Sequence, residues 1–222
     1  MGEHTLLSHS FFIQGTIMSR IAVDIVLLPE QAMTDLAIAA NGELVKNSGS
    51  EIMLNKKDCL PHISLAMGCI DRRDVARVGE MLRPIAVIAP KRLKVVDIIK
   101  STNFSGETVS VFQVKRSEQL QKLHEEICDI VRPFFNWDVT DDMISGGHAL
   151  RPGSGQASAS TLGWIENYFV KSAYSNYSPH ITIGYGDLPD RPLPCDFAVS
   201  HMAICHLGNH CTCTKVLWSV EI

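Results

Sequence analysis

The sequence contains no apolar run close to the roughly 20 residues that a membrane-spanning helix requires, so we expect no membrane partner. Its first residues lack the basic segment of a secretory signal peptide. It also lacks an excess of cations, because the formal net charge is −4, whereas proteins that grip long nucleic acids usually carry many phosphate-neutralising side chains. These absences favour a cytoplasmic protein and still permit a local pocket for a phosphate group.

The cysteines show no CxxC spacing, which is the usual mark of a structural zinc site. There are seven of them, and an odd number without a secretion signal predicts reduced thiols. The tail does group several candidate metal ligands, namely Cys205, His206, His210, Cys211 and Cys213. A two-residue turn at 208–209 would bring His206, Cys211 and Cys213 together. The spacing weighs against a metal, so we expect no metal and no cofactor, with a zinc-dependent hydrolase as the least favoured alternative.

Two stretches of the chain are nearly identical in pattern. Residues 61–68 read Pro-His-Ile-Ser-Leu-Ala-Met-Gly, and residues 179–186 read Pro-His-Ile-Thr-Ile-Gly-Tyr-Gly. Both are short, rich in branched aliphatic residues and closed by glycine, which predicts a β-strand in each case.

Each of these strands places a histidine and a hydroxyl two positions apart. Side chains alternate between the faces of a strand, so His62 and Ser64 share one face, and His180 and Thr182 share one face of the other. The aliphatic side chains between them point the opposite way, into a core. A strand that is polar on one side and apolar on the other is expected to line a cleft.

Periodicity along the rest of the chain predicts an α+β fold. The apolar residues alternate or follow helical spacing in turn, with proline, glycine and capping residues between the segments. We expect strands at 21–28, 59–70, 92–100, 108–115, 179–186, 197–207 and 210–220, and helices starting near 29, 71, 117 and 162. With one motif in each half, this order suggests two pseudo-symmetric lobes of antiparallel sheet, with helices outside and a groove between the lobes.

Two segments lie outside that regular pattern. Residues 1–17 are a weakly patterned N-terminal extension, and residues 18–222 are expected to form a single bilobal domain. Residues 136–161 are rich in glycine and serine and predict an insertion loop that reshapes or covers the groove. His148 and Arg151 in this loop are candidate substrate contacts, although a solvated loop is the simpler interpretation.

Two histidines that face one substrate can perform acid–base chemistry. Imidazole titrates near pH 6.5, so one ring can take a proton from an attacking oxygen while the other gives a proton to the leaving oxygen. The neighbouring hydroxyls can donate hydrogen bonds to phosphate oxygens as negative charge grows on them. Such a site suits a 2′,3′-cyclic phosphate or another phosphodiester of ribose.

The paired His-x-Ser/Thr pattern resembles the 2H phosphoesterase superfamily, which includes RNA 2′,3′-cyclic phosphodiesterases and 2′-5′ RNA ligase-like proteins. The resemblance implies that His62 and His180 are catalytic, that Ser64 and Thr182 bind the phosphate, and that the substrate is a nucleotide or an RNA end. The sequence departs from the family at Tyr185, where ligase-like members often carry a basic residue, so we do not expect long RNA to bind. The tyrosine ring at this position is a candidate substrate contact that could stack on a base or ribose. A non-catalytic nucleotide-binding module is the alternative, and a monomer is favoured.

Overall fold

The computed structural model describes residues 20–102, 106–145, 157–192 and 195–222. The extension at 1–17, together with His148 and Arg151, lies outside these residues. The α helices and strands occur in the order β1 (Arg20–Pro29), α1 (Gln31–Ser48), β2 (Ile63–Asp71), α2 (Val75–Ala86), β3 (Arg92–Thr102), β4 (Thr108–Val114), α3 (Glu118–Val131), α4 (Ala159–Lys171), β5 (His180–Tyr185), β6 (Cys195–Leu207) and β7 (Cys213–Glu221). The expected α+β fold is therefore confirmed.

The strands form one antiparallel sheet of seven strands that has two halves. Its path is β2-β1-β6-β3-β4-β5, with β7 paired to β6 off this path. The long strand β6 belongs to both halves, because residues 195–198 pair with β3 and residues 199–206 pair with β1. The two motif strands, β2 and β5, are the last strands of the two halves.

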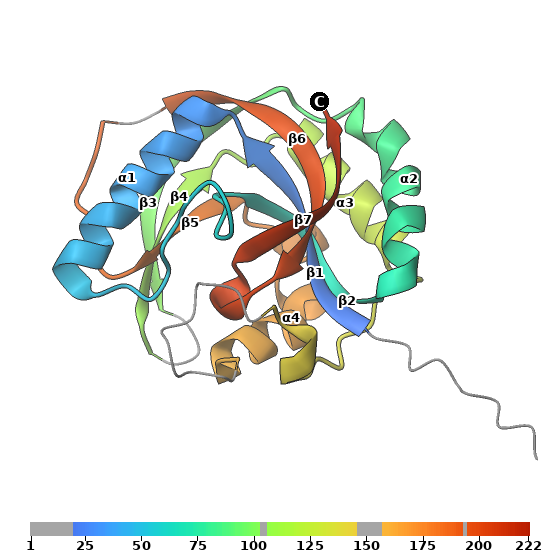
Figure 1. The fold of residues 1–222 in the computed structure, drawn as a ribbon. Helices are drawn as coiled ribbons and strands as arrows, with labels where there is room; N and C mark the ends of the chain where they lie inside the picture. Colours follow the sequence, from blue (N-terminus) through green and yellow to red (C-terminus); the bar gives the residue numbers. More distant parts are fainter. Residues whose placement is uncertain (1–19, 103–105, 146–156, 193–194) are drawn as a thin grey trace, which may run out of the picture.

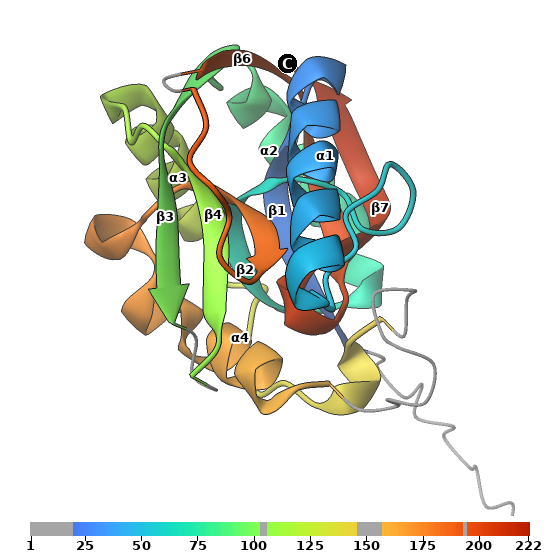
Figure 2. The ribbon, with the colours of Figure 1, turned by 90° about the vertical axis from the view of Figure 1, so that its left-hand side faces the viewer.

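The sheet curves so that these two end strands approach each other. Cα atoms of β2 and β5 come within 8 Å, although the strands stand at opposite ends of the pairing path. Figure 2 shows β5 between β4 and the region of β2. The helices lie around the outside, with α1 and α2 on opposite sides and α4 across one end of the strands (Figure 1). The groove expected between the halves thus has one motif strand on each side.

The segment at 136–161 differs in part from the expected loop. Residues 141–143 form a short 3-10 helix, and Asn136 makes reciprocal backbone hydrogen bonds with Cys69 on β2. Helix α4 begins at Ala159, where the hydroxyl of Ser158 caps it by accepting a hydrogen bond from the N–H of Thr161. Its N-terminal turn therefore belongs to the wall of the groove and not to a loop.

The C-terminal hairpin has a longer turn than predicted. A 3-10 turn at Asn209–Cys211 replaces the two-residue turn, so Leu207 pairs with Cys213. Cys205 and Cys213 form a disulfide between the adjacent strands, with their Cα atoms 5.5 Å apart. The expectation that all cysteines are reduced is therefore wrong for this pair, because the hairpin register brings the two thiols together.

None of the helices within the described ranges is both long enough and apolar enough to span a bilayer.

Candidate active site

The predicted site residues meet in one pocket between β2, β5 and α4. Its volume is about 390 Å³. The predicted residues that line it are His62, Ser64, His180, Thr182 and Tyr185. The aliphatic neighbours Ile63, Leu65, Ile181 and Ile183 are fully buried on the other face, as the alternation predicted. Two segments from separate halves of the chain thus contribute the same polar pair to one cavity.

The two strands also share an irregularity that the sequence comparison did not reveal. In the pairing of β1 with β2, Val26 faces Ser64 and Ile25 faces Ala66, so Leu65 is an extra, bulged residue. In the pairing of β4 with β5, Val111 faces Thr182 and Ser110 faces Gly184, so Ile183 is bulged in the same way. A β-bulge re-aims the neighbouring side chains and leaves backbone groups without ladder partners.

Each bulged carbonyl is bound by a buried side chain from an outer helix. His124 on α3 donates from Nδ1 to the carbonyl of Leu65 at 2.6 Å. Asn41 on α1 donates from Nδ2 to the carbonyl of Ile183 at 2.7 Å. Because an unpaired buried carbonyl is costly, these bonds stabilise the bulges that aim the hydroxyls of the two motifs into the pocket.

The two pocket histidines are held in the same tautomer. The Nδ1 of His62 is 2.7 Å from the carbonyl of Leu60, and the Nδ1 of His180 is 2.8 Å from the carbonyl of Ser178. A carbonyl can only accept, so in both rings Nδ1 carries the hydrogen, and in the neutral ring Nε2 keeps its lone pair. Both rings are therefore oriented so that Nε2 can exchange a proton.

Tyr177 connects the second motif to the first. Its hydroxyl donates to the carbonyl of Ser64 at 3.1 Å, and its ring stacks on His124 with centroids 3.9 Å apart. His124 in turn accepts a hydrogen bond from the backbone N–H of Tyr174 at 2.7 Å. Tyr177 and His124 are both buried, and together they link the second motif to the bulge of the first.

Burial dominates the electrostatics of the pocket. It lowers the pKa of His62 to about 4, against the opposing hydrogen bond to Leu60, and the charge of His180 lowers this pKa further. Burial also lowers the pKa of His180, while its bond to Ser178 acts in the opposite direction. Both rings are thus neutral at neutral pH, and a bound anion would favour their protonated forms.

Asp24 is a member of the site that sequence reasoning did not select. It interrupts the apolar strand β1, is fully buried, and its Oδ2 lies 2.5 Å from Ser64 Oγ and 3.7 Å from His62 Nε2. Burial raises the pKa of this carboxyl well above its usual value, and the bond from Ser64 only partly offsets that effect. The signal in the sequence was a single acid within an otherwise aliphatic strand.

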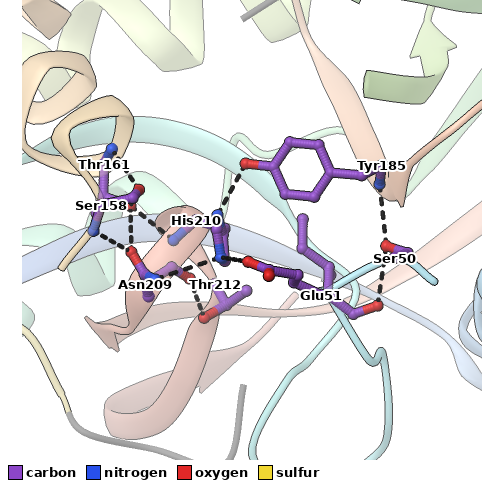
Figure 3. A network of polar contacts seen from close by, with 9 residues as sticks. Ser50, Glu51, Ser158, Thr161, Tyr185, Asn209, His210 and Thr212 are labelled. Carbon is purple, nitrogen blue, oxygen red and sulfur yellow. Dashed lines mark hydrogen bonds and ion pairs between the residues drawn. The ribbon is translucent and has the colours of Figure 1, made fainter. Parts of the chain in front are cut away.

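Tyr185 is fixed at the edge of the pocket by a polar network (Figure 3). Its hydroxyl is hydrogen bonded to Nδ1 of His210 at 2.8 Å, and Nε2 of His210 lies 3.3 Å from the carboxylate of Glu51. His210 has a left-handed backbone with φ 58°, which is strained for a residue with a side chain. Its N–H donates to Thr161 at 2.7 Å, so the strained turn is tied to the start of α4.

Helix α4 supplies the remaining wall. Trp164, Tyr168 and Lys171 recur at helical spacing and all line the pocket. Lys171 is the one lysine or arginine among the lining residues that the structure describes. The pocket therefore combines a mainly apolar and aromatic wall with little positive charge.

The tail does not assemble the alternative zinc site. Cys205 and Cys213 are joined in the disulfide and cannot act as thiolate ligands. His206 Nε2 is hydrogen bonded to the carbonyl of Met143 at 3.0 Å. In the described ranges no cluster of three or more histidine, cysteine or acidic side chains has a geometry that could hold a metal. The register of the hairpin, which differs from the expected one, is the physical reason.

The chain has an α+β fold in which a curved antiparallel sheet carries helices on its outside and a groove between its two halves. This fold can be compared with those of solved structures. The chain resembles the crystal structure of the Thermus thermophilus protein TT0787, with 15% identity, a TM-score of 0.52, and coverage of 90% of this chain and 97% of that one. At this identity the likeness concerns the fold alone. The likeness agrees with the expected α+β fold of antiparallel sheet with helices outside.

Two further structures are similar at a lower level. Escherichia coli LigT in its apo form has 12% identity and a TM-score of 0.46, and covers 91% of this chain and 97% of its own. Usb1 of Kluyveromyces marxianus has 10% identity and a TM-score of 0.40, with the same two coverages of 91% and 97%. No known family model matches the sequence, and no curated protein sequence matches it either.

Proposed function

We propose that the protein is a metal-independent phosphodiesterase of the 2H type. In this proposal His62 and His180 act as general acid and base on a 2′,3′-cyclic phosphate or a 2′-5′ phosphodiester of a nucleotide or RNA end. The observation that supports it most strongly is the duplication of the site. Both motif strands carry the same bulge and the same Nδ1-to-carbonyl bond, and both present Nε2 to one pocket.

The chemistry needs only these side chains and water. One imidazole takes a proton from water as the water oxygen attacks phosphorus, and the bond from phosphorus to one ribose oxygen breaks. The other imidazole protonates that leaving oxygen, so the proton count balances and a phosphomonoester results. Each transfer is typically worth roughly 10²- to 10⁴-fold in rate. The Thr182 hydroxyl, which makes no hydrogen bond within the described residues, is available to a phosphate oxygen.

A small substrate fits the pocket better than a long polyanion. The single cationic side chain on the lining is that of Lys171, counted over the described residues, and a cavity of about 390 Å³ accommodates a nucleotide-sized molecule. The aromatic wall from α4 offers a surface on which a base can stack. We therefore place a mononucleotide or a short RNA end in the pocket.

The test is a turnover screen in the presence of EDTA. The substrates are the four 2′,3′-cyclic mononucleotides and a 2′-5′-linked dinucleotide, and the variants are His62→Ala, His180→Ala and the double variant. Each single variant is expected to lose at least about 10³-fold in kcat, with little further loss in the double variant, because the two rings act as a unit. His201→Ala is the matched control, since this half-buried histidine on β6 does not line the pocket.

Three results would overturn the proposal. Wild-type turnover by either single variant would remove the histidines from the mechanism. Tight nucleotide binding without turnover of any substrate in the screen would instead identify a binding module, and loss of activity in EDTA would point to a metal.

A further inference from the structure

Asp24 breaks the symmetry of the duplicated site. Ser64 and Thr182 occupy equivalent positions beside their bulges, yet among the described residues a carboxyl group lies behind Ser64 alone. Asp24 reaches this position from the middle of β1, where it is fully buried. The inference that follows concerns this carboxyl and rests on the proposed function.

The direction of one hydrogen bond decides whether Ser64 can serve the substrate. A serine has a single hydroxyl hydrogen. If Asp24 is ionised, that hydrogen points to Asp24 Oδ2, 2.5 Å away, and only lone pairs face the pocket. A phosphate oxygen is also an acceptor, so Ser64 could then offer it nothing.

The surroundings of Asp24 favour the neutral carboxylic acid. Its Oδ1 is buried and receives no hydrogen bond from any described residue. Among the described residues, the titratable groups that interact electrostatically with Asp24 are His62 beside β2, Tyr168 from α4, Tyr177 ahead of β5 and Cys211 from the turn before β7.

All four of these neighbours are uncharged at neutral pH. Burial lowers the pKa of His62 to about 4 and raises the pKa of Tyr168, Tyr177 and Cys211. An isolated buried carboxylate with one oxygen unpaired is far costlier than the neutral acid.

We propose that Asp24 is a positioning residue that works as a neutral acid. Its carboxyl hydrogen is donated to Ser64 Oγ, and the Ser64 hydroxyl hydrogen is thereby turned toward a phosphoryl oxygen of the substrate. No proton is transferred in this arrangement, since the acid keeps its hydrogen throughout. The competing arrangement is an ionised Asp24 paired with a protonated His62. The distance of 3.7 Å between Asp24 Oδ2 and His62 Nε2 is longer than a hydrogen bond and weighs against that pair.

The test compares Asp24→Asn with Asp24→Ala. The asparagine amide can donate to Ser64 Oγ as the carboxylic acid does, so Asp24→Asn is expected to keep kcat/KM for a cyclic mononucleotide within about 3-fold. Asp24→Ala leaves the Ser64 hydroxyl without the donor that orients it, and kcat/KM is expected to fall roughly 10-fold or more. The basic limb of the pH profile should be less steep in Asp24→Asn than in wild type, because the amide cannot ionise.

Double variants locate the effect on Ser64. Adding Asp24→Ala to Ser64→Ala should cause almost no further loss of kcat/KM. Adding Asp24→Ala to Thr182→Ala should lower kcat/KM by the same factor as Asp24→Ala does in the wild type. Additive losses with Ser64→Ala would overturn the proposal. So would an Asp24→Asn variant as impaired as Asp24→Ala, which is the result expected for an ionised partner of His62.

A measurement without turnover separates this inference from the proposed function. Carbon-13 NMR of the aspartate carboxyl groups follows the ionisation of Asp24 with pH. The Asp24 signal is assigned as the one that disappears in Asp24→Asn or, failing that, as the one that shifts in Ser64→Ala. The Asp24 signal is expected to stay in its protonated form at neutral pH, with and without inorganic phosphate as the probe. Ionisation near the ordinary aspartate value of about 3.9 would refute the inference even if the enzyme is active. Absence of turnover with a protonated Asp24 would refute only the proposed function.

Discussion

Asn41 is the most informative single position for testing how the outer helices support the site. Its side chain donates to the carbonyls of Ile52 at 2.8 Å and Ile183 at 2.7 Å, and accepts from the N–H of Leu54 at 2.8 Å. Asn41→Ala leaves two buried acceptors and one buried donor without this partner. Each unpaired buried group costs about 1–3 kcal/mol, so with partial relaxation we expect a loss of about 3–5 kcal/mol in the free energy of unfolding.

The assay is urea unfolding together with thermal unfolding followed by circular dichroism. In a chain of this size each kcal/mol shifts Tm by about 2–4 °C, so Asn41→Ala should lower Tm by roughly 6–20 °C. Because the freed carbonyl of Ile183 adjoins Thr182, kcat/KM should also fall at temperatures where the variant is folded.

The next residue provides a matched control of opposite sign. Gly42 lies inside α1, and a Cβ added there would meet no atom within 4 Å. Gly42→Ala should therefore stabilise the helix by about 0.5–1 kcal/mol and leave activity unchanged. The reasoning is refuted if Asn41→Ala costs less than about 1 kcal/mol, or if both variants destabilise the protein equally.

Three further predictions test the electrostatics and the hairpin. Since burial lowers the pKa of both His62 and His180, the protonated form that the acid requires is lost early, and kcat/KM should peak below about pH 6.5; a peak above about pH 7.5 would contradict this. Asp24 ionises in the unfolded chain near pH 4 but at a raised pKa in the folded protein, so wild type should lose stability as pH rises through this window. Asp24→Asn should not show that loss. Urea titrations would contradict this prediction if the difference in the free energy of unfolding between wild type and Asp24→Asn were the same at about pH 4 and about pH 8. The disulfide closes a separation of 8 residues, so Cys213→Ser should lower the free energy of unfolding by about 2–3 kcal/mol, measured against wild type under oxidising conditions.

The strand and helix pattern was accessible from sequence because burial on one face leaves a clear period. The alternation around His62 and His180 predicted which side chains line the pocket, and most element boundaries follow the apolar spacing. The pair Asn41-Gly42 is typical of a turn, yet α1 continues through both residues. Tertiary hydrogen bonds from the asparagine override the local turn preference of the pair.

Features set by pairing register could not be predicted in the same way. The bulges at Leu65 and Ile183 depend on which residues of β1 and β4 they face, and a single sequence does not specify that. The turn at Asn209–Cys211 adopts left-handed backbone at His210 and Cys211, where local preference favours glycine or asparagine. The two-residue turn expected at 208–209 would group His206 with Cys211 and Cys213, whereas the observed register pairs His206 with Lys215.

The continuity of β6 has a mechanical consequence for access to the pocket. One unbroken strand of 13 residues is hydrogen bonded to β3 near its start and to β1 and β7 further along. In many proteins, domains close by rotation about a few loop residues. Here a rotation of one half of the sheet against the other would have to break hydrogen bonds between β6 and its neighbouring strands. The two halves of the sheet are therefore held at a fixed separation by the ladders that they share through β6.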